Sequence, residues 1–423
     1  MNIDLKACFV ALIVLATSSV AWGAASGSQN DEGFSLSIFG NANMDDAIDE
    51  QDIEYLKGVI AGISPATNLS DANYDGKIDE DDITQVDLII KGEEKKLTFV
   101  DSANRTVTIE MPVEAIAALH TSPCREFCML EAKDRVVGVT EYLFDDPDMY
   151  PGLGEKANIG SSATPNYEKI AEIRPDVLIC QLSKQYLDPV IAACEPIGID
   201  VVSLDLRPPQ GGRAQELKYD LELRMLGYIL GKVDRANAFI KWRQDIMHLA
   251  EERTSELADQ DRVRVLCLDF TSVASGNAEF YYGWGQRFIN LSGGRNIAGS
   301  LPSSGKISGE WILEEDPDVI ILASCYPSEG FGYSLANYTL ANESLSVVLK
   351  NSILGQTNAA KNGNVFLYSY YGLGSGGQTQ LGALYLAKRI YPELFEDIDP
   401  VQFHREYFEE WFGIPYQGVW FYP

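Results

Sequence analysis

The sequence repeats itself in a way that fixes the class of fold. Residues 168–179 read Glu-Lys-Ile-Ala-Glu-Ile-Arg-Pro-Asp-Val-Leu-Ile, and residues 310–321 read Glu-Trp-Ile-Leu-Glu-Glu-Asp-Pro-Asp-Val-Ile-Ile, 142 residues further on. Each copy is typical of a short helix that proline stops and a continuous apolar strand follows, as in parallel sheets covered on both faces. The repeat therefore predicts an α/β fold built as two similar lobes.

Other segments extend this prediction to a domain layout. Apolar runs predict further strands at 135–139, 199–204, 263–268 and 364–368. Residues 215–257 contain no proline, and their apolar residues recur near helical spacing, which predicts a long spine helix between the lobes. The alternative is two helices that break near Gly231. We therefore expect lobe one at 105–210, the spine at 215–257 and lobe two at 262–423.

Residues 71–82 carry the spacing of an EF-hand-type calcium loop. Oxygen-bearing side chains fall at loop positions 1, 3, 5, 9 and 12, glycine stands at position 6, and position 7 offers its backbone carbonyl. The predicted calcium ligands are Asp71, Asn73, Asp75, Lys77, Asp79 and Asp82. A weaker copy at 41–52 predicts a second set of ligands, namely Asn41, Asn43, Asp45, Asp49 and Asp52. The alternative for both loops is a solvated polar turn that precedes a helix.

Each loop leads into one short apolar helix, and together residues 38–92 resemble a type I dockerin. The resemblance implies a small all-α domain that binds calcium and attaches, without catalysis, to a cohesin on another protein. The first loop departs from the family pattern with Asn41 in place of aspartate and Asp46 in place of glycine. Positions 10 and 11, which often help to choose the partner, are Glu50-Gln51 and Glu80-Asp81.

Composition and the N-terminus bear on location. The net charge of −29 argues against binding to nucleic acid or anionic lipid. Lys6, the apolar run 7–16 and the small residues before Ala24 predict an export signal at 1–23, with an uncleaved anchor as the alternative. No other segment is long and apolar enough to predict a membrane span. We expect an exported, extracytoplasmic or cell-surface monomer whose six remaining cysteines are buried thiols, or disulfides.

From about residue 105 to 422 the chain resembles the iron-siderophore and vitamin B12 class of ABC-transporter substrate-binding proteins, the class III periplasmic binding proteins. The resemblance rests on the repeat and on the ordered segments 105–112, 135–142, 159–168 and 291–297. It implies two Rossmann-like lobes that capture an iron chelate, haem or corrinoid for an ABC permease. It also implies that an acidic residue on each lobe, Glu168 and Glu310, docks on the permease. The alternative role for both is stabilisation of a helix N-terminus.

Ligands of open α/β sheets bind beyond the carboxyl ends of the strands. The residues expected there, many of them aromatic and suited to a flat chelate, are His120, Tyr142, Ser161, Ser162, Gln181, Tyr281, Tyr282, Trp284, Arg287, Tyr326, Tyr370 and Tyr371. Arg287 is expected to hold a carboxylate or phosphate.

Three alternatives stay open at this stage. His120 with Cys124 and Cys128, which lie four residues apart, could ligate iron or haem, or the cysteines could simply be buried. The chain could be a cohesin-tethered surface or scaffold protein without a transporter, or a chelatase-type enzyme on the same fold. Phosphate loops, serine elbows and zinc-protease motifs are not found in the sequence, so we do not expect an enzyme.

Overall fold

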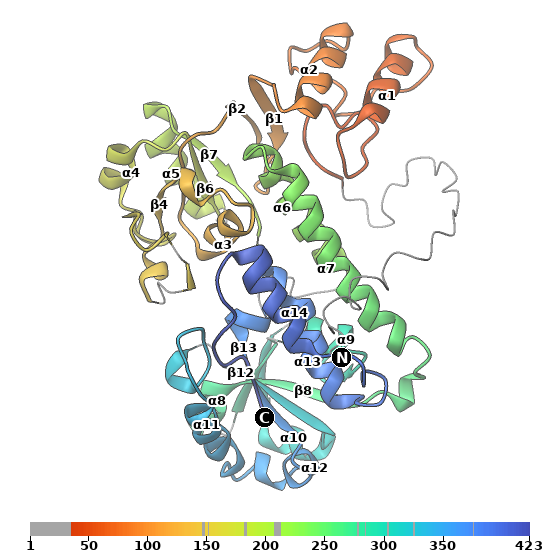
Figure 1. Cartoon of the computed structure of the whole chain (residues 1–423), viewed down its shortest axis with the longest axis vertical. Coiled ribbons are helices and arrows are strands. Elements are labelled where there is room, and N and C mark those ends of the chain that lie inside the picture. The colour runs from red at the N-terminus through yellow and green to blue at the C-terminus, as the bar shows by residue number, and fades with distance from the viewer. Residues whose placement is uncertain are drawn as a thin grey trace, which may run out of the picture.

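The computed structural model describes residues 35–423, apart from 146–148, 151, 182–183, 207–212, 277–278, 284, 303, 325 and 375. The signal segment 1–23, Trp284 and Cys325 lie outside the described residues. The chain forms a small helical unit at its N-terminal side and two α/β lobes, with long helices between the lobes (Figure 1). The predicted two-lobed α/β fold is confirmed.

Lobe one is built on a parallel sheet. Its five strands run in the order β5-β4-β3-β6-β7, and every neighbouring pair is parallel. The central strands are buried on both faces, which explains their unbroken apolar sequences. The strands are β3 (Ile116–Ala118), β4 (Val136–Val139), β5 (Ala157–Asn158), β6 (Val177–Cys180) and β7 (Asp200–Ser203). The helices are α3 (Thr121–Met129), α4 (Tyr167–Ile173) and α5 (Lys184–Cys194).

Lobe two has a mixed sheet in the order β11-β9-β8-β12-β13-β14, with β10 paired to β8. Its parallel core is β8 (Arg264–Asp269), β12 (Val319–Ser324) and β13 (Val365–Ser369). The antiparallel strands are β9 (Glu279–Tyr282), β11 (Gly305–Ser308) and β14 (Phe421–Tyr422), and β10 spans Arg295–Asn296. The helices are α8 (Phe270–Ala274), α9 (Gln286–Leu291), α10 (Gly309–Glu315), α11 (Thr339–Leu349), α12 (Asn358–Lys361), α13 (Thr379–Ile390) and α14 (Pro400–Glu406).

The sequence repeat is also a structural repeat. Helices α4 and α10 both have seven residues, and both end on a non-glycine residue in the left-handed conformation, Arg174 at φ 44° and Asp316 at φ 42°. After each proline an aspartate accepts backbone N–H groups at the start of a neighbouring strand: Asp176 from Glu114 and Ala115 at 2.8 Å, and Asp318 from Arg264 at 2.9 Å. The same residues thus fasten helix to sheet in both lobes.

The predicted single spine helix is wrong, and the alternative with a break near Gly231 is correct. Helices α6 (Arg213–Ile229) and α7 (Val233–Thr254) run antiparallel as a hairpin. Gly231 turns the chain at φ +59°. A Cβ on Gly227 would come within 2.8 Å of the Ala236 side chain, so glycine is needed where the helices approach. The apolar periodicity continues through this turn, which is why the sequence predicted one helix.

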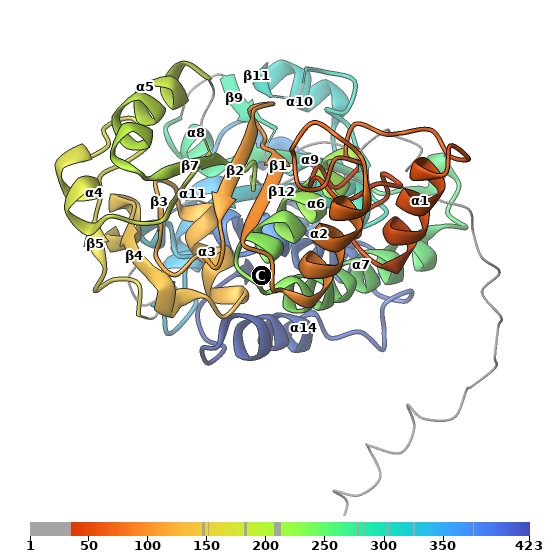
Figure 2. The same ribbon diagram turned by 90° about the horizontal axis from the view of Figure 1, so that it is seen from above.

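The small helical unit packs against lobe one and the helix hairpin and is not a separate domain core. It contains α1 (Glu50–Ile60) and α2 (Glu80–Lys91), and the hairpin of β1 (Lys96–Val100) and β2 (Thr106–Glu110) follows (Figure 2). Buried side chains of the unit, such as Leu56 and Val86, belong to the same apolar core as lobe one and the helix hairpin. Among the described residues no helix is both long enough and apolar enough to cross a membrane.

Candidate functional site

On lobe one, the predicted contact residues follow four strands. His120 caps α3, since its Nδ1 accepts the Ser122 backbone N–H at 3.2 Å. Ser161 is buried and shares a hydrogen bond with the Thr164 hydroxyl, and Ser162 donates to the Leu119 carbonyl at 2.8 Å. These bonds fold the loop after β5 onto the end of β3.

Two side chains with buried polar atoms flank that point, and the described residues offer those atoms no hydrogen-bond partner. Gln181 follows β6 and Thr140 follows β4, the strands on either side of β3. Both amide atoms of Gln181 and the hydroxyl oxygen of Thr140 are buried and have no partner among the described residues. Buried polar groups in folded proteins are almost always satisfied, so a ligand or water is expected to complete these. Sequence reasoning found Gln181 but not Thr140.

Three of the predicted aromatic residues follow strands and keep much of their surface in solvent. Tyr142 follows β4 in lobe one and is 48% exposed, whereas Tyr326 and Tyr371 follow β12 and β13 in lobe two and are 57% and 51% exposed. Tyr281, on the antiparallel strand β9, is 41% exposed. Large aromatic side chains this exposed are available for stacking on a flat ligand.

The other predicted lobe-two residues are used inside the protein. Tyr282 is buried and donates its hydroxyl to the Pro302 carbonyl at 3.1 Å. Tyr370 is buried, with its ring 5.5 Å from that of Tyr371. Arg287 is 12% exposed, and its Nε bonds to Glu216 of α6 at 3.0 Å. Arg287 therefore ties lobe two to the helix hairpin, whatever its remaining N–H groups contact.

A buried polar cluster that sequence reasoning missed joins the lobes through α6. The Tyr219 hydroxyl donates to Glu126 of α3 at 2.9 Å, while a Cβ on Gly377, eight residues after β13, would come within 2.7 Å of the same hydroxyl. Helix α3 of lobe one and the segment before α13 of lobe two thus meet at one residue of α6. Ligands of open α/β sheets bind beyond the carboxyl ends of the strands, so the ends of both sheets are taken as the candidate site.

The charged groups of this cluster are buried, and those of the helix hairpin form ion pairs. Arg243 of α7 is fully buried, bonds Asp220 at 2.6 and 3.1 Å and also bonds Glu216. Burial raises the pKa of Glu126 to about 7, even though Arg125 and the Tyr219 hydrogen bond act in the opposite direction. No sequence signal marks these residues, because isolated acidic and basic residues in helices usually lie on the surface.

The described cysteines are buried thiols, which is the simpler of the two alternatives given above. Cys124 and Cys128 are buried free thiols, as are Cys180, Cys194 and Cys267. Burial raises the pKa of Cys128 to about 12 and that of Cys124 further, so both are protonated thiols in the metal-free protein. No group of three or more His, Cys, Asp or Glu within the described part of the chain is placed to hold a metal ion by itself.

In the second loop, residues 71–82, the acidic side chains bond to the loop backbone. Asp71 accepts the N–H groups of Asp75 and Gly76 at 3.0 and 2.9 Å, and Asp82 accepts those of Asn73 and Asp79 at 3.1 and 2.8 Å. Gly76 makes the bend at φ +90°. Asp79 caps α2, and the Asp75 carboxylate accepts the Lys77 N–H at 2.9 Å.

The first loop, residues 41–52, repeats this arrangement and adds an unsatisfied oxygen. Asp52 accepts the N–H groups of Asn43 and Asp49 at 3.1 and 2.9 Å. The Asn41 amide donates across the loop to the Asp45 carbonyl at 2.8 Å, yet its Oδ1 is buried and has no partner in the described chain. Burial, with the charges of Asp45 and Asp49 added, raises the pKa of Asp52 to about 7. The carboxylates of this loop do not converge as a metal-binding group among the described residues, so a calcium assignment rests on the loop spacing and on this buried oxygen.

Glu168 and Glu310 occupy equivalent places. Each lies in the first turn of its seven-residue helix, α4 or α10, and each is exposed. Asn166 and Ser308 cap the two helices by accepting N–H groups of Lys169 and Trp311. The two carboxylates therefore mark matching surface points on the two lobes.

Comparison with known proteins matches the bilobal part. A family model described as periplasmic binding protein matches residues 116–371. The molybdate-binding protein MolA of Haemophilus influenzae is 22% identical over an alignment of 349 positions that covers 77% of this chain and 90% of that protein.

Solved structures show the same fold. The TroA-like periplasmic binding protein FepB from Veillonella parvula is 20% identical, covers 77% of this chain and 98% of its own, and has a TM-score of 0.64. MolA bound to molybdate is 20% identical with coverages of 76% and 99% and a TM-score of 0.61. A periplasmic haem-binding protein from Pseudomonas aeruginosa is 21% identical with coverages of 67% and 94% and a TM-score of 0.50.

Proposed function

The chain belongs to the periplasmic binding protein family, and from that premise we propose that it captures an iron chelate, haem or corrinoid outside the cytoplasm and delivers it to an ABC importer. Members of this family are carriers rather than enzymes and work with ABC permeases. The names of the similar proteins cover molybdate and haem, so the cargo proposed here falls within the family's range of metal-containing ligands.

The observation that carries the proposal is the unsatisfied pair Gln181 and Thr140. A ligand at the end of β3 would supply the hydrogen bonds that these buried groups lack. Tyr142 after β4 of lobe one, and Tyr326 and Tyr371 after β12 and β13 of lobe two, offer exposed ring faces on which a flat chelate would stack. The site therefore combines a few polar contacts with aromatic surface, as small-molecule sites usually do.

A ligand panel tests the proposal. The purified full chain would be titrated with ferric hydroxamate and catecholate siderophores, haem, cobalamin and molybdate, with calorimetry and absorbance as readouts. We expect one of the metal chelates to bind with 1:1 stoichiometry. If molybdate binds instead, the cargo is an oxyanion and not a chelate. If no member of the panel binds, the capture proposal is wrong.

A substitution of Gln181 tests whether this residue contacts the ligand or only stabilises the fold. Gln181→Leu replaces an amide that has no partner among the described residues with an apolar group of similar size, so we expect it to raise the melting temperature while weakening chelate binding at least tenfold. Gln356→Leu, at an exposed glutamine before α12, should leave binding unchanged. A Gln181→Leu protein with unchanged affinity would remove the residue from the proposed site.

Delivery to the permease is assigned to Glu168 and Glu310. Their matching positions on the two lobes suit a two-point contact with a permease that has basic patches. Glu168→Arg with Glu310→Arg is expected to abolish uptake in a reconstituted importer without changing chelate affinity. Glu172→Arg, on the same exposed side of α4, is the control. Full uptake by the double variant would contradict the assignment.

The small unit at 38–92 is proposed to bind calcium and to attach the carrier to a cohesin-type partner. Support comes from the repeated loops, the unsatisfied Asn41 oxygen and the helix that follows each loop. Asn41, Asn43, Asp45, Asp49 and Asp52 would hold one ion, and Asp71, Asn73, Asp75, Lys77, Asp79 and Asp82 the other. Calcium is expected to raise the melting temperature of the full chain, and an EGTA-treated sample that melts at the same temperature would contradict this.

A further inference from the structure

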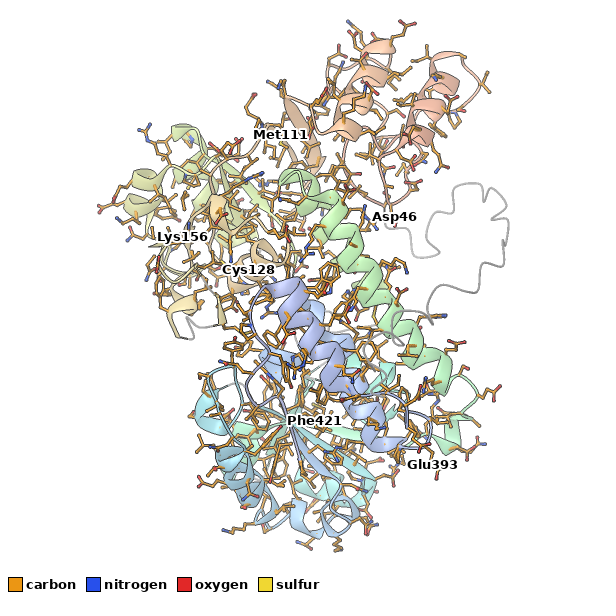
Figure 3. The ribbon with its side chains drawn as sticks, in the orientation of Figure 1. Asp46, Met111, Cys128, Lys156, Glu393 and Phe421 are labelled. Atoms are coloured by element: carbon orange, nitrogen blue, oxygen red, sulfur yellow. The ribbon has the colours of Figure 1, made fainter. Side chains whose placement is uncertain are left out.

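The first calcium-type loop is held by the helix hairpin of the carrier. Arg224 of α6 donates from one nitrogen to both the backbone carbonyl and the carboxylate of Asp46, at 2.7 and 2.9 Å. Two residues further on, the Ile48 N–H donates to the Tyr228 hydroxyl at 3.1 Å. Figure 3 marks Asp46 at this junction, beside α6.

These contacts lie on either side of the backbone carbonyl that the loop is expected to offer to calcium. Ala47 stands at loop position 7, whose backbone carbonyl is a ligand in EF-hand-type loops. Asp46 and Ile48, its neighbours on either side, are the two residues that α6 holds. The position of the Ala47 carbonyl is therefore set by the carrier part of the chain as well as by the loop itself.

The second loop lacks this arrangement. Gly76 and Ile78 occupy the equivalent positions, and Gly76 is exposed and bends at φ +90°, whereas Asp46 has no positive φ. Within the described chain, residues 75–81 make no hydrogen bond or ion pair with the lobes or the helix hairpin. The replacement of glycine by Asp46, which weakens the match to a dockerin loop, is the substitution that gives Arg224 its partner.

We propose that the first loop is a calcium-dependent latch that fixes the small unit against α6. Calcium in the loop orders the segment 46–48, which strengthens its contacts with Arg224 and Tyr228. By thermodynamic reciprocity the same contacts raise the affinity of the first loop for calcium. The second loop is left free for an external partner. The latch rests on the calcium binding proposed above and adds that the two loops have different tasks.

Calcium titration calorimetry of the full chain tests the latch. Asp45→Ala and Asp75→Ala first assign the two binding events to the first and second loops. Tyr228→Phe then removes only a hydroxyl, and Arg224→Lys keeps the positive charge, so a change in local electrostatics cannot imitate the result. We expect each variant to weaken calcium at the first loop about tenfold and to leave the second loop unchanged. Arg253→Lys, at the far end of α7 and paired with Asp397, is the matched control.

A structural readout makes the test independent of affinity. Hydrogen exchange of residues 46–48 and 224–228 is expected to slow when calcium is added to the parent chain and to Asp75→Ala, but not to Asp45→Ala. If calcium binds both loops and Tyr228→Phe and Arg224→Lys behave like the parent, the latch is wrong while calcium binding stands. If neither loop binds calcium, the calcium-binding proposal falls and the latch falls with it.

Discussion

The two lobes share one helix–strand unit but differ in the residues that come after their strands. Helices α4 and α10 match in length, cap and terminal left-handed residue, and the proline-aspartate after each helix fastens it to its sheet. Beyond the strands, lobe one presents buried polar atoms at Thr140 and Gln181 and one exposed ring, Tyr142, whereas lobe two presents a buried amide at Gln378 and two exposed rings, Tyr326 and Tyr371. The shared part is scaffold, and the part that differs is where a ligand would be recognised.

The largest effect is expected at the helix hairpin that both lobes contact. Arg243→Ala leaves the buried carboxylates of Asp220 and Glu216 without their main partner. Removing one member of a buried ion pair typically costs about 3–5 kcal/mol, so urea denaturation should show a loss of this size. Lys241→Ala, which is exposed on the same helix, should change little. If the two variants were equally stable, the lobes would not depend on this network.

A buried acid that lobe two lacks should make stability depend on pH. The pKa of Glu126 is raised by burial from 4.5 to about 7, while the corresponding helix α8 has no charged residue. Between pH 4.5 and about pH 7, Glu126 is protonated in the folded state and ionised in the unfolded state, so the folded state binds more protons. This stabilisation is therefore complete below pH 4.5 and is lost as the pH rises to 7.

The pH effect can be isolated with Glu126→Gln. This variant should remove about 2–3 kcal/mol of the fall in unfolding free energy between pH 5 and pH 8, as 1.4 kcal/mol per pKa unit implies. Glu251→Gln, on the exposed side of α7, serves as the control. A pH profile of Glu126→Gln that overlays the parent profile would show that Glu126 titrates normally.

The repeated aspartates offer a direct comparison of the scaffolds. Asp176 accepts two backbone N–H groups and Asp318 accepts one. We expect Asp176→Ala to cost about 1.5–3 kcal/mol and Asp318→Ala about half as much, since hydrogen bonds to charged groups contribute amounts of this order. Thermal and urea unfolding would measure both. A larger loss for Asp318→Ala would break the proposed equivalence of the two units.

The smallest effects are expected from single tyrosines at the strand ends. Tyr326→Ala and Tyr371→Ala should each weaken chelate binding about five- to tenfold, because a stacked ring contributes roughly 0.5–1.5 kcal/mol. Tyr142→Ala should act similarly from lobe one. Calorimetry with the bound chelate measures all three variants. If only the lobe-two variants lose affinity, lobe two alone supplies the aromatic surface.

The sequence predicted those features that local patterns determine. Proline-terminated helices and unbroken apolar strands mark the lobes, because each signal lies within a dozen residues of sequence. The α6–α7 hairpin was predicted only as an alternative, since helical periodicity passes through Gly231 and only the close approach of Gly227 to Ala236 reveals the turn. Helix boundaries that depend on such packing cannot be predicted from the local sequence pattern.

The site was predictable only in part. Gln181 and the tyrosines were expected, because residues after parallel strands gather at one edge of a sheet. The cluster of Glu126, Tyr219 and Arg243 was missed, since its members are far apart in sequence and read individually as surface residues. The contact between Asp46 and Arg224 is equally long-range, so the different surroundings of the two calcium-type loops could not be read from their motifs.

Hydrogen exchange with and without the bound chelate tests the central claim most directly. If the cargo lies between the lobes, protection should appear together at the segments after β4 and β6 in lobe one, around Thr140 and Gln181, and after β12 and β13 in lobe two, around Tyr326 and Tyr371. The repeated helices α4 and α10 should exchange unchanged. Protection confined to one lobe, or to the surface of the small unit, would contradict the account.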